Sequence, residues 1–381
     1  MNTELKKFIQ KFVWFIFPYV VLLIFTLIIF YKSGEIFWYN RTINSQVIEG
    51  KNFIYGAAYS NLPHCFRFSA VEIKSPKIIA LGSSRVLQFR AAFFIDSISF
   101  YTAGGVFKRL EQQRAFLESL PVNKLPQSII LGLDQWWFNA RYDSALKTKN
   151  DLIYNQYSWS DNWIGLNSWQ QFYYDCWTGK INLKKIWGSK KQDVEWLGIS
   201  ARMENFGFRK DGSRAYGNII SDETISNRIK TAIDSIRNDN GLFRWTNEPD
   251  KNAVNELRTF LRFCKKNKIT VTGFLPPIHS KLLNEMKKHI EHYPNFFELY
   301  NILYPVFREN GFYVYDFTVP ENYGGSDAEM VDAVHGSEKL FLKLYLKLLQ
   351  KDSYLNQFSD STYLKTKLNS MNGNFDVFGN N

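Results

Sequence analysis

The chain has 381 residues, of which 17% are aromatic, and a formal net charge of +11. This length predicts one large domain or two smaller ones, with ample material for a packed core. The charge could serve an acidic partner such as nucleic acid, anionic lipid or a charged glycan. However, no dense Lys/Arg run occurs, which argues against nucleic acid and favours basic side chains spread over a solvated surface. Cys65, Cys176 and Cys264 are far apart and odd in number, which argues against a zinc site or a disulfide framework and leaves at most one bridge.

The first predicted element is a membrane-spanning helix. Residues 12–31 carry no charge, and 20 residues of helix extend about 30 Å, the thickness of a bilayer core. Pro18 could kink this helix, which membrane helices tolerate. No small-x-small cleavage site follows, so we expect an uncleaved, single-pass anchor. The lysines before it favour a cytoplasmic N-terminus at residues 1–11 and a periplasmic or extracellular C-terminal part.

After an irregular stem at residues 32–75, short apolar runs alternate with amphipathic ones. Strands are predicted at Lys77–Leu81, Ser97–Thr102, Ser128–Leu133, Thr270–Leu275 and Phe312–Phe317. Helices are predicted at Val106–Leu120, Asn252–Asn267, Asn295–Glu309 with a kink or break near Pro305, and Ser337–Leu349. This alternation predicts an α/β domain at residues 76–350, in which helices cover both faces of a parallel sheet and the crossovers are right-handed.

Residues 140–245 interrupt the alternation. This stretch is rich in Trp, Tyr, Asn, Ser and Asp and has no long apolar period. A disordered linker is a poor explanation, because disordered segments contain few aromatic residues. We therefore expect an aromatic-rich insertion that covers or lines the active-site end of the sheet. The polar segment 351–381 is expected to form a peripheral tail.

A serine motif follows the first strand of this domain. Gly82-Ser83-Ser84 comes directly after the apolar run Ile78–Leu81, so the Ser84 hydroxyl would stand at the carboxyl edge of the sheet, where ligands bind in such folds. If Arg85–Ala91 begins a helix, its free N–H groups could stabilise an oxyanion there. For this motif alone, an ordinary strand-to-helix turn with a serine N-cap is the simpler alternative.

An Asp-x-x-His motif precedes the last predicted helix. Among the five histidines, only His335 has an aspartate, Asp332, three residues before it. Positions i and i+3 lie on one side of a turn, so Asp332 can hold one imidazole nitrogen while the other faces a serine. The alternative is a surface Asp and a surface His. The order of the two motifs, both at strand–helix junctions, favours a catalytic triad of Ser84, His335 and Asp332.

In these motifs the chain resembles the SGNH/GDSL hydrolase superfamily, over about residues 76–350. That family has Gly-Asp-Ser after its first strand and Asp-x-x-His before its last helix. The resemblance implies a three-layer, flavodoxin-like α/β/α fold with Ser84 as nucleophile, Asp332 as orienting acid and His335 as general base. Ser83, in place of the family's Asp, looks like the membrane-anchored branch that includes the D-alanyl transfer protein of teichoic-acid modification and the alginate and peptidoglycan O-acetylation proteins.

The resemblance also implies oxyanion donors. The family's glycine after the second strand matches Gly104 or Gly105, for which a flexible turn is the alternative. Its third motif, Gly-x-Asn-Asp, is replaced here by Gly132-Leu133-Asp134-Gln135. The asparagine amide is therefore missing, and an Asp134 carboxylate would repel an oxyanion unless it points away. The Gln135 amide or Asn139 could substitute. This departure puts efficient free-standing hydrolysis in question more than the triad.

Other polar groups are weaker candidates. Glu285, His289 and His292 have the i, i+4, i+7 spacing of metal ligands, but the charged residues around them favour a plain surface helix. We expect no metal and no cofactor. His279, after Pro276-Pro277, could line the same cleft or be structural. Several tryptophans could stack on sugar rings or pack in a core or lid: Trp136, Trp137, Trp159, Trp163 and Trp169.

Together these features predict a membrane-anchored enzyme that transfers or removes an acyl group, with acetyl the expected one, on a hydroxyl of a cell-surface polysaccharide. The reaction would pass through an acyl-enzyme at Ser84. A multi-pass membrane O-acyltransferase partner is implied by the resemblance alone. One alternative is an anchored carbohydrate esterase that works without a partner. Another is a non-catalytic assembly or glycan-binding protein on a degenerate hydrolase scaffold, which the altered third motif would favour.

Overall fold

The structure is a computed structural model that describes residues 3–36, 38–47, 52–61, 65–142, 164–188 and 194–379. The chain folds into two compact units, each made of two chain segments. Unit 1 comprises Met1–Pro63 and Ser158–Gly207, and unit 2 comprises His64–Tyr157 and Phe208–Asn381. The predicted stem and the predicted insertion are therefore each divided between the two units.

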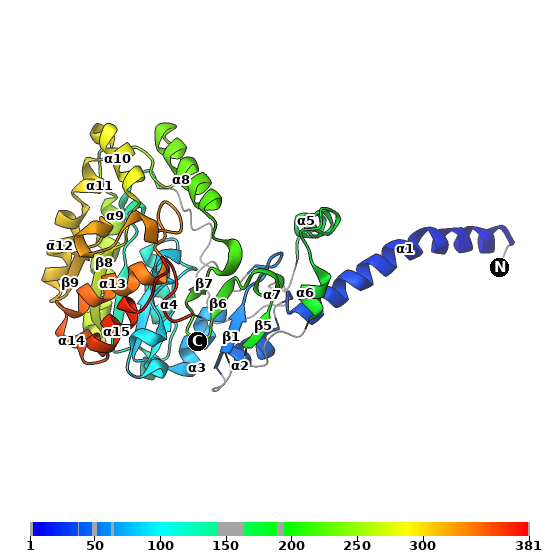
Figure 1. Cartoon of the computed structure of the whole chain (residues 1–381), viewed down its shortest axis with the longest axis horizontal. Coiled ribbons are helices and arrows are strands. Elements are labelled where there is room, and N and C mark those ends of the chain that lie inside the picture. The colour runs from blue at the N-terminus through cyan, green and yellow to red at the C-terminus, as the bar shows by residue number, and fades with distance from the viewer. Residues whose placement is uncertain are drawn as a thin grey trace. The chain divides into compact units, whose positions relative to one another are not determined.

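Unit 1 begins with one long helix, α1 (Thr3–Ser33), which continues unbroken through Pro18 (Figure 1). Its 31 residues extend about 46 Å, and among the described residues it is the one helix long and apolar enough to span a membrane. Most of its apolar side chains are exposed, whereas Thr26, Ile29, Phe30 and Ser33 are buried. The last turns of α1 are thus packed within unit 1.

The other elements of unit 1 surround the end of α1. They are α2 (Tyr39–Val47), β1 (Asn52–Tyr55), α5 (Leu166–Trp177), α6 (Leu183–Trp187), β5 (Val194–Leu197) and α7 (Ile199–Glu204), with β1 and β5 paired in parallel. The buried carboxylate of Glu35, just after α1, accepts backbone N–H groups from residues 58–60 and from Ile199, at 2.5–2.9 Å. This carboxylate therefore joins the end of α1 to the loop after β1 and to the start of α7.

Unit 2 is built on a five-stranded sheet in the order β3-β2-β4-β8-β9. The strands are β2 (Ile78–Leu81), β3 (Phe100–Thr102), β4 (Ser128–Gly132), β8 (Thr270–Leu275) and β9 (Tyr313–Asp316). Every neighbouring pair is parallel, which confirms the predicted α/β domain with a parallel sheet. From β2 the chain passes to β3 on one side and then returns across β2 to β4 on the other. The strand order therefore reverses between β2 and β4.

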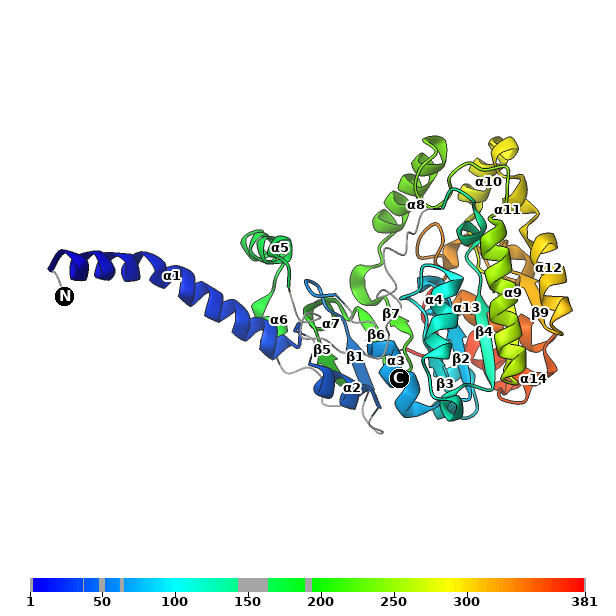
Figure 2. The same cartoon turned by 180° about the vertical axis from the view of Figure 1, so that it is seen from behind.

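Helices cover both faces of this sheet (Figure 2). Successive strand residues point to opposite faces, and in β2 Ile79 and Leu81 belong to one buried apolar cluster whereas Ile78 and Ala80 belong to another. The first cluster takes residues from α3 (Cys65–Lys74), α4 (Leu110–Glu118), α9 (Lys251–Lys266), α10 (Ser280–Lys288) and α12 (Leu299–Glu309). The second takes them from α13 (Glu338–Leu349), α14 (Ser353–Asn356) and α15 (Ser361–Asn369). Burial on both faces explains why β2 is a continuous apolar run.

The remaining elements are β6 (Gly207–Arg209), β7 (Arg214–Ala215), α8 (Asp222–Arg237) and α11 (Pro294–Phe297). Of the kink or break predicted near Pro305, the break is wrong, because α12 continues through Pro305 and the chain instead turns at Glu298, between α11 and α12. The prediction of a peripheral tail is also wrong. Leu355, Leu364 and Val377 are buried in the second apolar cluster, so the tail completes the core beneath α13.

The predicted aromatic insertion at 140–245 does not form one body. Residues 164–188 and 194–207 belong to unit 1, whereas residues 208–245 belong to unit 2. Trp159 and Trp163 lie outside the described residues.

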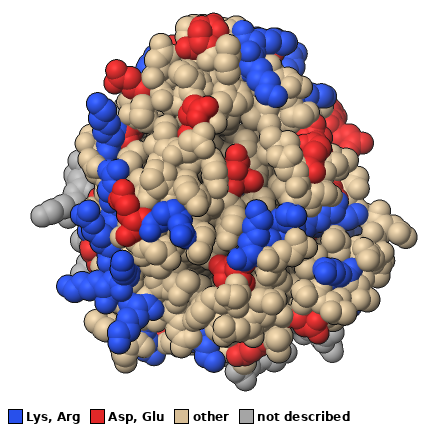
Figure 3. Space-filling model, turned by 90° about the vertical axis from the view of Figure 1, so that its left-hand side faces the viewer, with Lys and Arg blue, Asp and Glu red and all other residues tan. Residues whose placement is uncertain are grey.

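Figure 3 shows one face of the molecule, over the part of unit 2 that carries β9 and α12. Lys and Arg side chains are spread over this face, with Asp and Glu side chains among them. The net charge of +11 is therefore not gathered into a single basic patch on this face.

Candidate active site

Ser84 lies in a tight turn that follows β2. Ser83 caps this turn, since its hydroxyl accepts the N–H of Arg85 at 3.2 Å. The turn is a single 3-10 turn over Ser84–Val86, and no α-helix continues from it. The helix that was considered for Arg85–Ala91 is thus absent, so no helix dipole points at Ser84. Ser84 itself is only partly buried.

The structure brings Ser84 together with both residues of the Asp-x-x-His motif. Ser84 Oγ lies 2.8 Å from His335 Nε2. On the other side of the imidazole, Nδ1 lies 2.8 Å and 3.0 Å from the two carboxylate oxygens of Asp332. The imidazole therefore has a carboxylate on one nitrogen and a serine hydroxyl on the other, which is the arrangement of a Ser-His-Asp triad.

A closed turn holds the Asp332–His335 pair. Val331 donates its N–H to the carbonyl of His335, and Met330 forms an antiparallel bridge with Gly336. Within the turn, Asp332 Oδ1 accepts the backbone N–H groups of Val334 and His335 at 2.9 and 2.8 Å. The relative position of carboxylate and imidazole is thus set by the backbone of the turn.

The Asp332 carboxyl is strongly favoured in its ionised form. Burial by itself would raise its pKa, but attraction to His335, the hydrogen bond to that ring and the two backbone N–H bonds outweigh burial and hold the pKa well below the usual range. Arg228 of α8 adds a positive charge 3.8 Å from Asp332 Oδ2. Asp332 is therefore a carboxylate at any pH near neutrality and can orient the imidazole.

The triad stands where the strand order reverses. Ser84 follows β2, and Asp134 and Gln135 follow the adjacent strand β4. In open parallel sheets, ligands bind beyond the carboxyl ends of the strands at this reversal, because the loops diverge there and leave a crevice.

Arg85 lies directly behind the serine and is buried, although it is charged. Its guanidinium makes four polar contacts. Nε donates to the Val334 carbonyl at 2.9 Å, and Nη2 donates to the Pro277 carbonyl at 2.7 Å. Nη1 donates to Gln135 Oε1 at 2.6 Å and lies 3.5 Å from Asp134 Oδ1. Its guanidinium also stacks over Trp136 at 4.9 Å. Sequence reasoning missed this residue. The one available signal was a charged residue followed at once by the apolar pair Val86-Leu87.

Two backbone N–H groups are candidates for an oxyanion hole. Among the described residues, the backbone N–H groups of Ser84 and Gly104 donate to no acceptor, whereas the N–H of Gly105 donates to the Gly82 carbonyl at 3.2 Å. A Cβ at position 104 would lie 3.0 Å from the carbonyl oxygens of both Gly82 and Ser83. Gly104 therefore lies against the serine turn as only glycine can. Of the two predicted glycines, Gly104 is the one with an available donor.

The predicted substitutes for the missing asparagine are engaged elsewhere. The Gln135 amide donates to the Pro276 carbonyl at 3.0 Å while its oxygen accepts from Arg85. The Asn139 amide donates to the Arg244 carbonyl at 2.6 Å. Asp134 is buried beside Arg85; burial raises the pKa of its carboxyl, and Arg85, Ser83 and His335 partly offset that effect. Both hydrogens of the Gln135 amide are thus engaged, since it also donates to Thr318 Oγ1 at 3.3 Å, and one hydrogen of the Asn139 amide is engaged.

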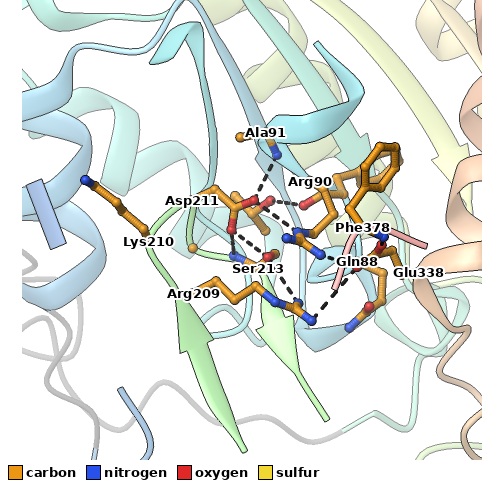
Figure 4. Close-up of polar contacts among 12 residues, drawn as sticks. Gln88, Arg90, Ala91, Arg209, Lys210, Asp211, Ser213, Glu338 and Phe378 are labelled. Atoms are coloured by element: carbon orange, nitrogen blue, oxygen red, sulfur yellow. Dashed lines mark hydrogen bonds and ion pairs between the residues drawn. The ribbon is translucent and has the colours of Figure 1, made fainter. Parts of the chain in front are cut away.

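A buried ionic network holds the start of α13, three residues after His335 (Figure 4). Glu338 pairs with Arg90, which also lies 3.2 Å from Asp211. The other oxygen of Glu338 accepts the backbone N–H groups of residues 377 and 378 at 2.9 and 2.6 Å. The network thereby ties the end of the triad turn to the loop after β2 and to the C-terminal tail.

The remaining candidates have other partners. Glu285 pairs with Arg237 at 2.6 Å and with Lys288 at 2.9 Å, while His289 and His292 stack on Trp245. No group of three or more His, Cys, Asp or Glu suited to a metal occurs among the described residues. His279 caps α10 and lines a cavity of about 520 Å³ beneath α8. Trp136 and Trp137 are buried in the core of unit 2, and Trp169 packs on α1 in unit 1.

The chain gives no match to any protein-family model or to any curated protein.

Proposed function

We propose that this chain is a serine-dependent enzyme of the SGNH type, anchored in a membrane by α1, which transfers an acetyl-sized acyl group to or from a hydroxyl of a cell-surface polysaccharide. The observation that carries the proposal is the 2.8 Å contact between Ser84 Oγ and His335 Nε2, with the Asp332 carboxylate on the opposite nitrogen. In this arrangement a histidine can remove the proton of a serine hydroxyl and so activate it as a nucleophile.

The first half-reaction loads the enzyme. His335 Nε2 takes the hydroxyl proton as Ser84 Oγ bonds to the acyl carbonyl carbon, and Asp332 stabilises the imidazolium that forms. The tetrahedral intermediate then releases the donor's leaving oxygen, which takes the proton from His335. The acyl group remains on Ser84 as an ester. In the second half-reaction a sugar hydroxyl gives its proton to His335 and attacks that ester, and the proton returns to Ser84.

The N–H groups of Ser84 and Gly104 would bind the oxyanion of each tetrahedral intermediate. The side-chain amides of Gln135 and Asn139 bond to other groups. This site therefore has fewer oxyanion donors than the SGNH/GDSL family, in which the asparagine of the third motif adds a side-chain amide. A weaker oxyanion hole stabilises the tetrahedral intermediate less. The site is therefore better suited to a reactive, activated acyl donor than to the hydrolysis of a stable ester. For this reason we favour transfer, with a multi-pass membrane O-acyltransferase as the donor's source and with an exported unit 2, over free-standing hydrolysis.

The first test is whether Ser84 reacts as a nucleophile. Detergent-solubilised full-length protein is incubated with a fluorophosphonate probe, and the modified peptide is identified by mass spectrometry. We expect labelling at Ser84, and a loss of at least about 10³-fold in labelling rate for Ser84→Ala and His335→Ala. Ser119→Ala, which removes an exposed hydroxyl at the end of α4, is the matched control and should label normally. Absence of labelling at Ser84 in the wild type would favour the non-catalytic scaffold instead.

The second test separates transfer from hydrolysis. The protein is acylated with p-nitrophenyl acetate, and the Ser84 ester is followed by mass spectrometry with and without soluble polysaccharide acceptors. A long-lived ester that decays faster when an acceptor is present supports transfer. Rapid multiple turnover that acceptors do not change would assign the protein as an esterase.

A further inference from the structure

Unit 1 contains two short helices, α5 and α6, that pack beside the end of α1. Four contacts join them to α1. Thr26 Oγ1 lies 3.0 Å from Tyr173 Oη, the ring of Phe30 lies 4.8 Å from that of Phe172 and 5.3 Å from that of Trp169, and the rings of Phe25 and Trp187 lie 6.0 Å apart. The α1 partners lie in the last part of the apolar run, which ends at Lys32. A bilayer core takes about 20 residues of helix. α5 and α6 therefore lie at the level where α1 would leave the bilayer.

The outward face of this helix pair is apolar and aromatic. Leu166, Tyr174 and Trp177 fall within one stripe of α5 and are 78%, 58% and 90% exposed, and Trp187 of α6 is 44% exposed. Exposing so much aromatic surface to water has a cost, since each such side chain would gain by burial. Trp and Tyr are enriched at membrane–water interfaces, because their rings are apolar and their N–H or O–H groups reach water.

Basic side chains accompany this stripe. Lys184 and Lys185 are exposed on α6, and Lys180, between the two helices, is exposed as well. Lysines beside an apolar face of a short helix attract anionic lipid headgroups while the apolar side chains enter the acyl boundary. Both features of the helix pair therefore fit the same partner, a lipid surface.

We propose that α5 and α6 form an interfacial helix pair that lies on the bilayer surface, with Trp177 and Trp187 in the headgroup region and Lys184 and Lys185 toward anionic headgroups. This inference rests on the proposed anchoring by α1, and it is independent of the chemistry at Ser84. Unit 1 would then be held on the membrane by two attachments, a spanning helix and a surface contact. Such a pair of attachments fixes the tilt of unit 1, which one spanning helix alone leaves free.

The chain provides its own probe position for a test. Cys176 is exposed and adjacent to Trp177, whereas Cys65 and Cys264 are buried. Full-length protein is labelled on Cys176 with the environment-sensitive fluorophore NBD and placed in nanodiscs of phosphatidylcholine and phosphatidylglycerol that contain spin-labelled lipid. We expect blue-shifted emission and stronger quenching by a spin label near the headgroup than by one at the end of the acyl chain. Lys184→Gln with Lys185→Gln should reduce the quenching in the anionic nanodiscs.

Two controls use a Cys176→Ser background. Phe17→Cys, within α1, should be quenched strongly by the spin label at the end of the acyl chain. Asn44→Cys, exposed on α2 of the same unit, should be quenched much less than position 176. Quenching at Phe17→Cys with none at Cys176 would overturn the surface contact and leave the anchor intact. If Phe17→Cys is not quenched, both anchor and surface contact are wrong, while labelling of Ser84 by the fluorophosphonate is unaffected. Protection of Cys176 in native membranes without quenching in pure lipid would assign the face to a protein partner instead.

Discussion

At the scale of single residues, the proposed site contains one buried cation, Arg85, directly after Ser84 in the chain. Arg85 donates to groups that follow β4 and β8 and to the turn that carries His335. These acceptors come from three segments far apart in the chain, and each would be left without its charged donor if the guanidinium were removed. Arg85 is therefore a positioning residue, because it acts on Ser84 and His335 through the loops that hold them.

We expect Arg85→Met to lower the fluorophosphonate labelling rate by about 10²-fold per folded molecule, because small displacements of catalytic groups cost about this much. Arg85→Lys should recover part of the rate, since an ammonium keeps the charge but cannot reach three diverging acceptors. Burial lowers the pKa of Arg85 to about 10, so the wild-type side chain is charged at neutral pH. The rate is normalised to the folded fraction measured by circular dichroism. A wild-type rate per folded Arg85→Met molecule would limit Arg85 to a role in folding.

At the scale of elements, the start of α13 is the part of the fold on which the triad turn depends. Ser337 caps the helix by accepting the N–H of Leu340 at 3.2 Å, and Glu338 at its first turn is fully enclosed by Arg90, Arg209 and the backbone of the tail (Figure 4). His335 lies directly before this cap. A fixed helix start therefore limits how far the imidazole can move relative to Ser84.

We expect Glu338→Ala to destabilise unit 2 by about 3–5 kcal/mol, because it removes one of the two carboxylates that pair with buried Arg90 and leaves the backbone N–H groups of residues 377 and 378 without their acceptor. Glu338→Gln is the matched comparison; its amide oxygen can still accept hydrogen bonds, so the loss should be smaller. Urea unfolding followed by circular dichroism gives the stability, and hydrogen exchange of residues 375–379 reports whether the tail loosens. If stability and hydrogen exchange are unchanged in Glu338→Ala, the start of α13 and the tail are held in place without this carboxylate.

The boundaries of two elements show where local sequence patterns are enough to place the ends of a strand or helix, and where they are not. Strand β8 occupies the predicted Thr270–Leu275, because its β-branched and apolar residues favour a strand and the two prolines that follow end it. By contrast, α4 begins at Leu110 and not at Val106, since the Gln112 side chain accepts the backbone N–H groups of residues 108 and 109 and caps the helix there. A side-chain cap depends on the detailed geometry of the helix start and does not change the spacing of the apolar residues. That spacing therefore could not show where α4 begins.

At the scale of the whole molecule, one partly buried lysine should shape the pH dependence of stability. Lys74 of α3 donates to the Lys210 carbonyl at 2.7 Å. Burial lowers the pKa of Lys74 to about 8, with a small opposing effect of Asp211. Between pH 8 and the ordinary lysine range near 10.5, the unfolded chain holds a proton that the folded chain has released. Stability of unit 2 therefore rises with pH in that window. Below pH 8 both states hold the proton, so the cost of burying the ammonium is fully present and does not change with pH.

We expect Lys74→Met to raise the free energy of unfolding at pH 7 by about 2 kcal/mol and to remove the rise between pH 8 and about 10.5. Lys77→Met, the same substitution at an exposed lysine three residues later, is the control and should leave the pH profile unchanged. Urea unfolding at a series of pH values measures both effects. Parallel profiles for Lys74→Met and the wild type would show that the amine is well solvated in the folded protein.

The sequence by itself determined the features that depend on neighbouring residues. The apolar runs of β2 and β8, the uncharged segment 12–31 and the Asp332–His335 spacing are local patterns, and the periodicity and flanking residues of each are legible without a structure. They were sufficient for the parallel α/β sheet, for the candidate spanning helix and for the prediction that Ser84 and His335 belong to one site.

Only the tertiary structure decided which distant residues meet. The contacts of Arg85, the pairing of Glu338 with Arg90, the division of residues 140–245 between two units and the burial of the tail all join segments far apart in the chain. The choice of Gly104 over Gly105 likewise depends on which N–H is already bonded. Local propensity carries no information on such contacts, because their energy arises from burial and charge pairing that exist only once the chain has folded.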